Sequence, residues 1–141
     1  MGKIDTIHNQ IITLISQDVT DFNQAFYEKP KTITDEKLPA FAVYYEGHEN
    51  EITTSRTNKR TYHYAIDIIY DKENIDETQT VTSDLVSQVI DCLESNDNYS
   101  LGGNANYTLP TKCTRIEDYQ IAGKHYLAYH IVLPVIFNTQ I

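Results

Sequence analysis

The chain has 141 residues, of which 40% are hydrophobic, so length and composition predict one compact domain, residues 1–141, with a single core. Its formal net charge of -9 argues against nonspecific binding to nucleic acid or to an anionic membrane, because both need exposed Lys and Arg. No apolar run approaches the roughly 20 residues that span a bilayer, no signal-peptide pattern opens the chain, and two cysteines are too few for a disulfide scaffold.

The first element in chain order is an amphipathic helix, predicted at about residues 3–18. Isoleucines recur along it at helical spacing: Ile4, Ile7, Ile11, Ile12 and Ile15. Phe22 and Phe26 extend this pattern loosely until Pro30 ends any regular structure. Residues 28–37 then form a polar connection.

Two strands are predicted next. Residues 40–45 are a short, largely apolar run suited to a buried strand. In residues 60–71 a large apolar side chain stands at every second position: Tyr62, Tyr64, Ile66, Ile68 and Tyr70. Since successive strand side chains point to opposite faces, this pattern predicts a half-buried strand with one aromatic and aliphatic face. The most distinctive segment of the chain is therefore a packing surface.

Residues 47–59 separate these two strands and contain almost no hydrophobic side chain. Loops of this length are uncommon in compact domains and usually have a use. We expect the segment to continue the two strands outward as a flexible, protruding polar arm that orders against a partner. Charged side chains of this segment, with Arg60 directly after it, are candidate interface residues: Glu49, Glu51, Arg56, Lys59 and Arg60.

A second amphipathic helix is predicted at about residues 77–95. Cys92 lies on its apolar stripe beside Leu85 and Val89, so we expect a buried, unreactive thiol. Residues 96–111 are rich in turn-forming residues and are expected to be a mobile connection.

The last third of the chain is predicted to be a hairpin of residues 113–121 and 127–137. Gly123-Lys124 fits a two-residue turn with glycine first. That turn would place Ile116 opposite Ile131 and Glu117 opposite His130. Pro134 cannot donate to a sheet ladder, so the last strand is expected to lie at an edge or to be bulged there.

The order helix, two strands, helix, two strands predicts an α+β fold: a four-stranded, mainly antiparallel sheet with both helices packed on one face. The other face would then be uncovered and would display Tyr119, Tyr126, Ala128, His130 and Val132. Eleven tyrosines and no tryptophan suit a protein interface, because tyrosine combines a large contact area with a polar end. Four of these residues complete the candidate interface: Tyr119, Tyr126, Ala128 and Val132.

No catalytic residue, metal site or cofactor is expected from the motifs. The segment His48–Glu51 has no second histidine at the helical spacing of a zinc motif. His63 and Asp67 share a strand face but stand roughly 13 Å apart, too far for one metal ion. Asp67 and Glu117 are a possible carboxylate pair, but nothing in their spacing requires it.

The chain resembles the tail terminator (tail completion) proteins of long-tailed bacteriophages. The resemblance rests on the element order, the length, the segment Leu38-Pro39-Ala40-Phe41-Ala42-Val43-Tyr44, the tyrosine strand from Arg60 to Tyr70, the apolar helix after it, and the hairpin Tyr119-Gln120-Ile121-Ala122-Gly123-Lys124-His125-Tyr126. It covers nearly the whole chain as a pattern of elements, without a diagnostic motif.

Membership of that family would imply a structural virion protein made in the host cytoplasm and located at the head-proximal end of the tail. It would form a ring, as a homohexamer, that caps the tail tube, stops tube polymerisation and docks the head–tail connector protein. DNA would pass its lumen only as cargo, which suits a negatively charged protein. Head-completion and tail tube proteins share similar outlines, and a stand-alone α+β enzyme or ligand-binding module is the rival class.

Overall fold

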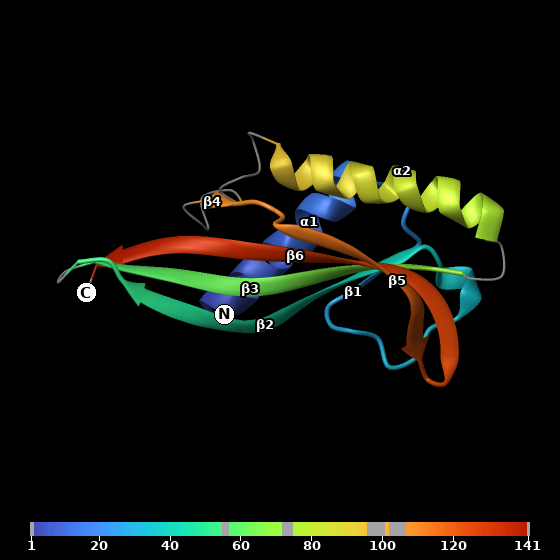
Figure 1. The fold of residues 1–141 in the computed structure, drawn as a ribbon, viewed down its shortest axis with the longest axis horizontal. Helices are drawn as coiled ribbons and strands as arrows, with labels where there is room; N and C mark the ends of the chain where they lie inside the picture. The colour runs from blue at the N-terminus through green and yellow to red at the C-terminus, as the bar shows by residue number, and fades with distance from the viewer. Residues whose placement is uncertain (1, 55–56, 72–74, 96–100, 102–106, 141) are drawn as a thin grey trace.

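The computed structural model describes residues 2–54, 57–71, 75–95, 101 and 107–140. Two helices, α1 (Lys3–Asp18) and α2 (Ile75–Glu94), pack with a six-stranded mixed sheet that curls into a half-barrel (Figure 1). The remaining elements are β1 (Gln24–Phe26), a short 3₁₀ turn η1 (Asp35–Lys37), β2 (Ala40–Ile52), β3 (Thr57–Tyr70), β4 (Tyr107–Thr108), β5 (Lys112–Ile121) and β6 (Lys124–Gln140). The predicted α+β class and both helices are confirmed.

The prediction of four strands is wrong. The strands run in the order β1-β2-β3-β6-β4, and β5 also pairs with β6; every pairing is antiparallel except that of β1 with β2. β1 and β4 have three and two residues, too few to show an alternating pattern in the sequence. Asn23 fixes β1 in place, because its side-chain nitrogen donates to the Leu38 carbonyl at 2.6 Å and its backbone N–H donates to the Pro39 carbonyl at 2.8 Å.

The main core lies between the two helices and one face of the sheet. The alternating side chains predicted for residues 60–71 and 127–137 do face this core, as do Ile7, Ile11 and Ile15 of α1 and Leu85, Val89 and Leu93 of α2. Full burial of each aliphatic side chain contributes about 1.5–3 kcal/mol. The hydroxyl of buried Tyr64 donates to the Ile4 carbonyl at 2.7 Å and so ties α1 to the sheet.

A second, smaller core occupies the opposite face of the sheet. It consists of Leu38, Ala40, Ile69, Tyr119, Ile121, Tyr126 and Ala128, with Phe26, Ile33 and Ile116 packed against them. The prediction that this face is uncovered is therefore wrong for Tyr119, Tyr126 and Ala128, which are at most 5% exposed. The cause is the curl of β5 and β6, which closes this end of the sheet over the connection between β1 and β2 (Figure 1). Of the four interface residues predicted for this face, only Val132 is partly exposed.

The turn between β5 and β6 lies one residue earlier than predicted. Ala122 and Gly123 form it, with φ of 52° and 79°, which are the two positive values of a type I′ turn. The register is shifted again between Ile116 and Tyr119. As a result Ile116 lies opposite Ala128, and His130 lies opposite Thr114, so the predicted pairs of Ile116 with Ile131 and of Glu117 with His130 do not form.

β6 is an interior strand, although Pro134 had predicted an edge or a bulge. β3 pairs with β6 along its whole length, including His63 with Pro134. On its other side, β4 ends at Thr108 opposite Val135, and β5 begins at Lys112 opposite Val132. The Pro134 carbonyl faces this second side, where it accepts from the Thr108 hydroxyl at 2.6 Å. Since the nitrogen and carbonyl of a strand residue point the same way, the missing N–H falls in the gap between β5 and β4.

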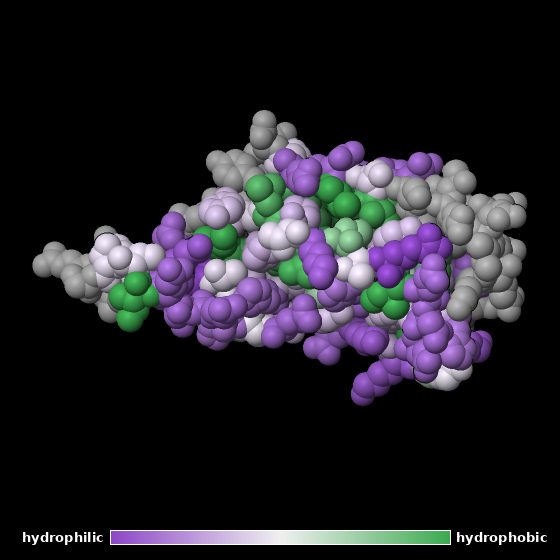
Figure 2. Space-filling model, viewed as in Figure 1, coloured by the Kyte–Doolittle hydropathy of each residue, from purple (hydrophilic) through white to green (hydrophobic). Residues whose placement is uncertain are grey.

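The predicted protruding segment is built of paired strands. β2 and β3 remain paired out to Ile52 and Asn58, and β6 accompanies them until Gln140 lies opposite Thr57. We call residues 47–54 and 57–59, with their flank 137–140 on β6, the arm. It reaches past both helices (Figure 1), and Figure 2 shows it narrowing away from the body, mostly hydrophilic with an apolar patch near its tip. Arg56 and most of the predicted 96–111 connection lie outside the described residues.

Candidate functional site

Two cavities meet at Tyr44, where the edge of β2 becomes open. β1 pairs with β2 only as far as Phe26 opposite Ala42, and the chain then diverges through residues 27–29. From Tyr44 onward, none of the described strands pairs with this edge of β2. The first cavity lies at the start of the open edge, beside the N-terminal half of α1. The second lies on the opposite face of the sheet, beside β5.

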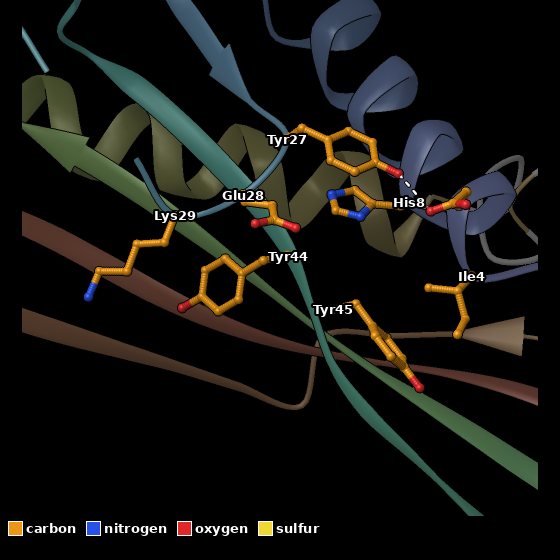
Figure 3. Close-up of a pocket in the computed structure, with 8 residues that line it drawn as sticks. Ile4, His8, Tyr27, Glu28, Lys29, Tyr44 and Tyr45 are labelled. Atoms are coloured by element: carbon orange, nitrogen blue, oxygen red, sulfur yellow. Dashed lines mark hydrogen bonds between the residues drawn. The ribbon is translucent and has the colours of Figure 1, made fainter. Parts of the chain in front are cut away.

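The first cavity, which we call the aromatic pocket, has a volume of about 410 Å³ and is lined by Ile4, Asp5, His8, Tyr27, Glu28, Lys29, Tyr44 and Tyr45 (Figure 3). The rings of His8 and Tyr27 stack with their centroids 3.8 Å apart. His8 Nε2 lies 2.5 Å from the Val43 carbonyl oxygen, and because a carbonyl only accepts, Nε2 carries the proton. The Tyr27 hydroxyl donates to Asp5 Oδ1 at 3.1 Å. The His8 ring is therefore held by the backbone of β2, and the Tyr27 ring is held by a side chain of α1.

Carboxylates outnumber cationic groups in the lining of the aromatic pocket. Burial lowers the pKa of His8, so this imidazole is neutral near pH 7. Burial raises the pKa of Tyr27, and the bond to Asp5 raises it further. Asp5 and Glu28 thus supply two negative charges. The lining cation, Lys29, is turned away: its Nζ lies 4.7 Å from the centroid of the Tyr119 ring.

A buried carboxylate marks the second cavity. Asp67 on β3 is 1% exposed and accepts three hydrogen bonds. The hydroxyls of Tyr119 and Tyr44 donate to Oδ2 at 2.6 Å and 2.9 Å, and His130 Nδ1 lies 2.6 Å from Oδ1. Burial raises the pKa of both tyrosine hydroxyls, and the Asp67 charge adds to this in each case. We call these four residues the Asp67 cluster.

The cavity beside the Asp67 cluster has a volume of about 490 Å³ and is also lined by Lys29, Ile116, Asp118 and Gln120. Since Asp67 holds Nδ1 of His130, Nε2 is the ring nitrogen that can meet a molecule in this cavity. The His130 side chain is 25% exposed, which permits such contact. A histidine oriented by a carboxylate has the arrangement of a general base, but here the carboxylate accepts three hydrogen bonds and links side chains of β2, β5 and β6 to β3.

The predicted interface residues do not form one surface. On the arm, Glu49 accepts from His63 Nε2 at 2.7 Å, and Glu51 lies opposite Lys59 across the strands. Arg60 is held by the Asn50 side-chain oxygen at 2.8 Å and by the Tyr62 hydroxyl at 3.2 Å. The other predicted interface residues lie on strands of the body: Tyr119, Tyr126 and Ala128 are in the second core, and Val132 is on β6.

The Asp67 cluster was missed by the sequence analysis. Asp67 and His130 both stand at outward positions of their strands, and this was visible from the alternation. Their contact depends on the pairing of β3 with β6, which places them directly opposite each other. Glu117, the partner considered for Asp67, is exposed and lies 3.8 Å from Arg115 Nε instead. No group of three or more metal-binding side chains comes together within the described part of the chain.

No protein-family model matches the chain, and a search of curated proteins found none significantly similar to it. Neither described helix has the length and apolar character needed to cross a membrane.

Proposed function

We propose that the protein is a structural subunit of a long-tailed bacteriophage virion, of the tail terminator class. Six copies form a ring that caps the tail tube, stops its polymerisation and provides the docking surface for the head–tail connector protein. The subunit performs no catalysis, and the Asp67 cluster braces the sheet. The proposal rests on the resemblance of the sequence and on one observation, the arm.

The arm supports self-assembly because two of its strand edges have no partner strand among the described residues. The edge of β2 beyond Ala42 has no partner among the described strands, and neither has the outer edge of β6 beyond Ile136. Ile52, near the tip, is 73% exposed. Monomeric proteins blunt such edges, whereas open edges pair readily with another chain. A cyclic ring requires two different patches on each subunit, and the arm and the body of the next subunit provide them.

The net charge of -9 agrees with a ring through which DNA passes. Few cations are present to hold phosphates, so DNA in the lumen would slide as cargo.

The decisive experiment is light scattering coupled to size-exclusion chromatography. We expect wild-type protein at high micromolar concentration, alone or with tail tube protein, to elute near six times the chain mass of 16.2 kDa. Deletion of residues 49–57 should leave the body folded, with a cooperative thermal transition by circular dichroism, and abolish the ring. Ile52→Lys should weaken assembly, and its matched control Leu109→Lys, at an exposed leucine outside the arm, should not.

A strictly monomeric wild-type protein under both conditions would refute the ring. A deletion variant that still assembles would show that the arm is not the interface. Imaging of the protein within a virion then separates a terminator from a head-completion or tail tube protein, since these occupy different positions along the particle.

One observation favours a second candidate function, a ligand-binding module or small enzyme. The cavity of about 490 Å³ places the oriented imidazole of His130 next to Lys29 and Gln120. A monomer that binds a small ligand, with binding abolished by His130→Ala, would favour this function over the ring.

A further inference from the structure

We propose that the aromatic pocket binds the side chain of a lysine or arginine carried by an extended segment of a partner protein. The segment pairs with the open edge of β2, and its basic side chain enters the pocket at the start of that edge. This inference does not depend on the ring, since any partner with such a segment satisfies it.

The walls of the aromatic pocket suit a cation. Tyr27 and His8 stack on each other in the pocket, and the rings of Tyr44 and Tyr45 complete its aromatic lining from the two sides of β2 (Figure 3). A cationic group over an aromatic face is attracted by the ring's electron density, and guanidinium groups also stack on such rings. Both Tyr44 and Tyr45 are anchored at their hydroxyls, to Asp67 and to His48, so their rings stay in position.

The charges of the pocket are not balanced within the described residues. The Glu28 carboxylate projects between the rings of His8 and Tyr44, and Lys29 extends away from it (Figure 3). Asp5 accepts only the neutral Tyr27 hydroxyl, and no described Lys or Arg forms an ion pair with Asp5 or Glu28. A guanidinium or ammonium group would donate charge-assisted hydrogen bonds to these carboxylates. An acidic side chain would be repelled.

The open edge explains how the cation is delivered. β1 ends opposite Ala42, so an added strand finds the unpaired backbone of β2 from Tyr44 onward. Strand addition supplies main-chain hydrogen bonds, and pockets for alternate side chains supply the specificity. The aromatic pocket lies at that first open position, between the diverging residues 27–29 and the edge itself. A partner strand in this place would put one of its side chains into the pocket.

The test uses the full chain labelled with ¹⁵N and three synthetic peptides of five residues. Each alternates threonine and valine, and the central residue is arginine, norleucine or glutamate. We expect the arginine peptide to shift the amide resonances of residues 27–29 and 44–48 saturably. The norleucine peptide should bind about three- to fivefold more weakly, the glutamate peptide more weakly still, and added salt should weaken only the arginine peptide.

Single substitutions locate the site. Glu28→Gln and Tyr27→Leu should each weaken the arginine peptide about three- to fivefold, and Lys29→Gln should strengthen it by removing a like charge. The matched controls, Asp118→Asn and Tyr107→Leu, change similarly exposed side chains outside the pocket and should change nothing.

Three results would overturn the inference. They are equal binding of the arginine and glutamate peptides, shifts confined to residues outside 27–29 and 44–48, and no saturable shift with any peptide. None of them bears on ring formation, which the light-scattering experiment measures without any of these peptides. A protein that fails to assemble but binds the arginine peptide would reject the proposed ring and keep this site.

Discussion

At the scale of single residues, Asp67 is the polar side chain on which most of its neighbours depend. It satisfies Tyr44, Tyr119 and His130, and the Tyr119 bond is buried from water. We expect Asp67→Ala to lower the free energy of unfolding by about 2–4 kcal/mol, because it leaves buried donors without an acceptor. Urea unfolding measures this. Glu117→Ala, at an exposed carboxylate, is the control and should stay within about 0.5 kcal/mol of wild type.

Cys92 is buried, as its position on the apolar stripe predicted, but it has polar neighbours. Its Sγ lies 3.3 Å from Asp18 Oδ2 and 3.7 Å from the Leu14 carbonyl. A hydroxyl placed there finds an acceptor, so Cys92→Ser should cost less than about 1 kcal/mol in urea unfolding. A loss of about 3 kcal/mol or more would mean that the hydroxyl remains unpaired in the apolar interior.

His8 should make stability depend on pH. Because burial lowers its pKa in the folded protein, the unfolded chain takes up the proton at a higher pH than the folded one. The contribution of neutral His8 is fully present above its ordinary pKa of 6.5, and it is lost as the pH falls from there through the lower folded value. Unfolding free energies of wild type and His8→Gln, compared from about pH 7.5 downward, should diverge in that window. Parallel curves would exclude the effect.

At the scale of elements, the turn between β5 and β6 contains a strained residue. Ala122 adopts a φ of 52°, which costs an ordinary residue about 1–2 kcal/mol. Ala122→Asn should therefore raise the free energy of unfolding by about 0.5–1 kcal/mol, since asparagine favours the first position of a type I′ turn. Gly123→Ala is the opposite case: a Cβ there has open space but a strained backbone, so it should destabilise. Thermal unfolding of both variants decides whether the turn has this form.

The sequence predicted those elements whose own residues show which of their faces is buried. The alternation of residues 60–71 was readable because one face of β3 packs on the helices throughout. β1 could not be predicted, because its position depends on the hydrogen bonds of Asn23 to the carbonyls of Leu38 and Pro39 and not on a pattern in its own residues. The burial of Tyr119 and Tyr126 depends on the curl of the sheet, which the alternation of one strand does not encode. The meeting of Asp67 with His130 depends on strand order, which is again a property of the whole sheet.

At the scale of the whole molecule, stability should be uneven. Within the body, β3 and β6 are buried against the main core, and near Ile69 and Ala128 they also contact the second core, whereas the arm has mostly exposed side chains on β2. Local opening is easiest where few apolar contacts are buried. Hydrogen exchange should therefore be slowest at residues 62–70 and 127–135 and faster along the arm, even though its backbone is paired. Equal protection in both regions would show that the arm is as rigid as the body.

The continuity of β3 and β6 from body to arm also has a mechanical consequence. Both strands run from the body to the tip of the arm without a break, so a force applied to the arm is transmitted directly to the sheet of the body. A pull along the strand axes loads the whole β3–β6 ladder in shear, and many hydrogen bonds share the force. A pull on β2 perpendicular to the strands breaks the β2–β3 hydrogen bonds one after another, so only one or two bonds carry the force at a time. The molecule should thus resist tension along the arm and yield to peeling across it, and pulling from the two directions with a single-molecule force probe would measure that difference.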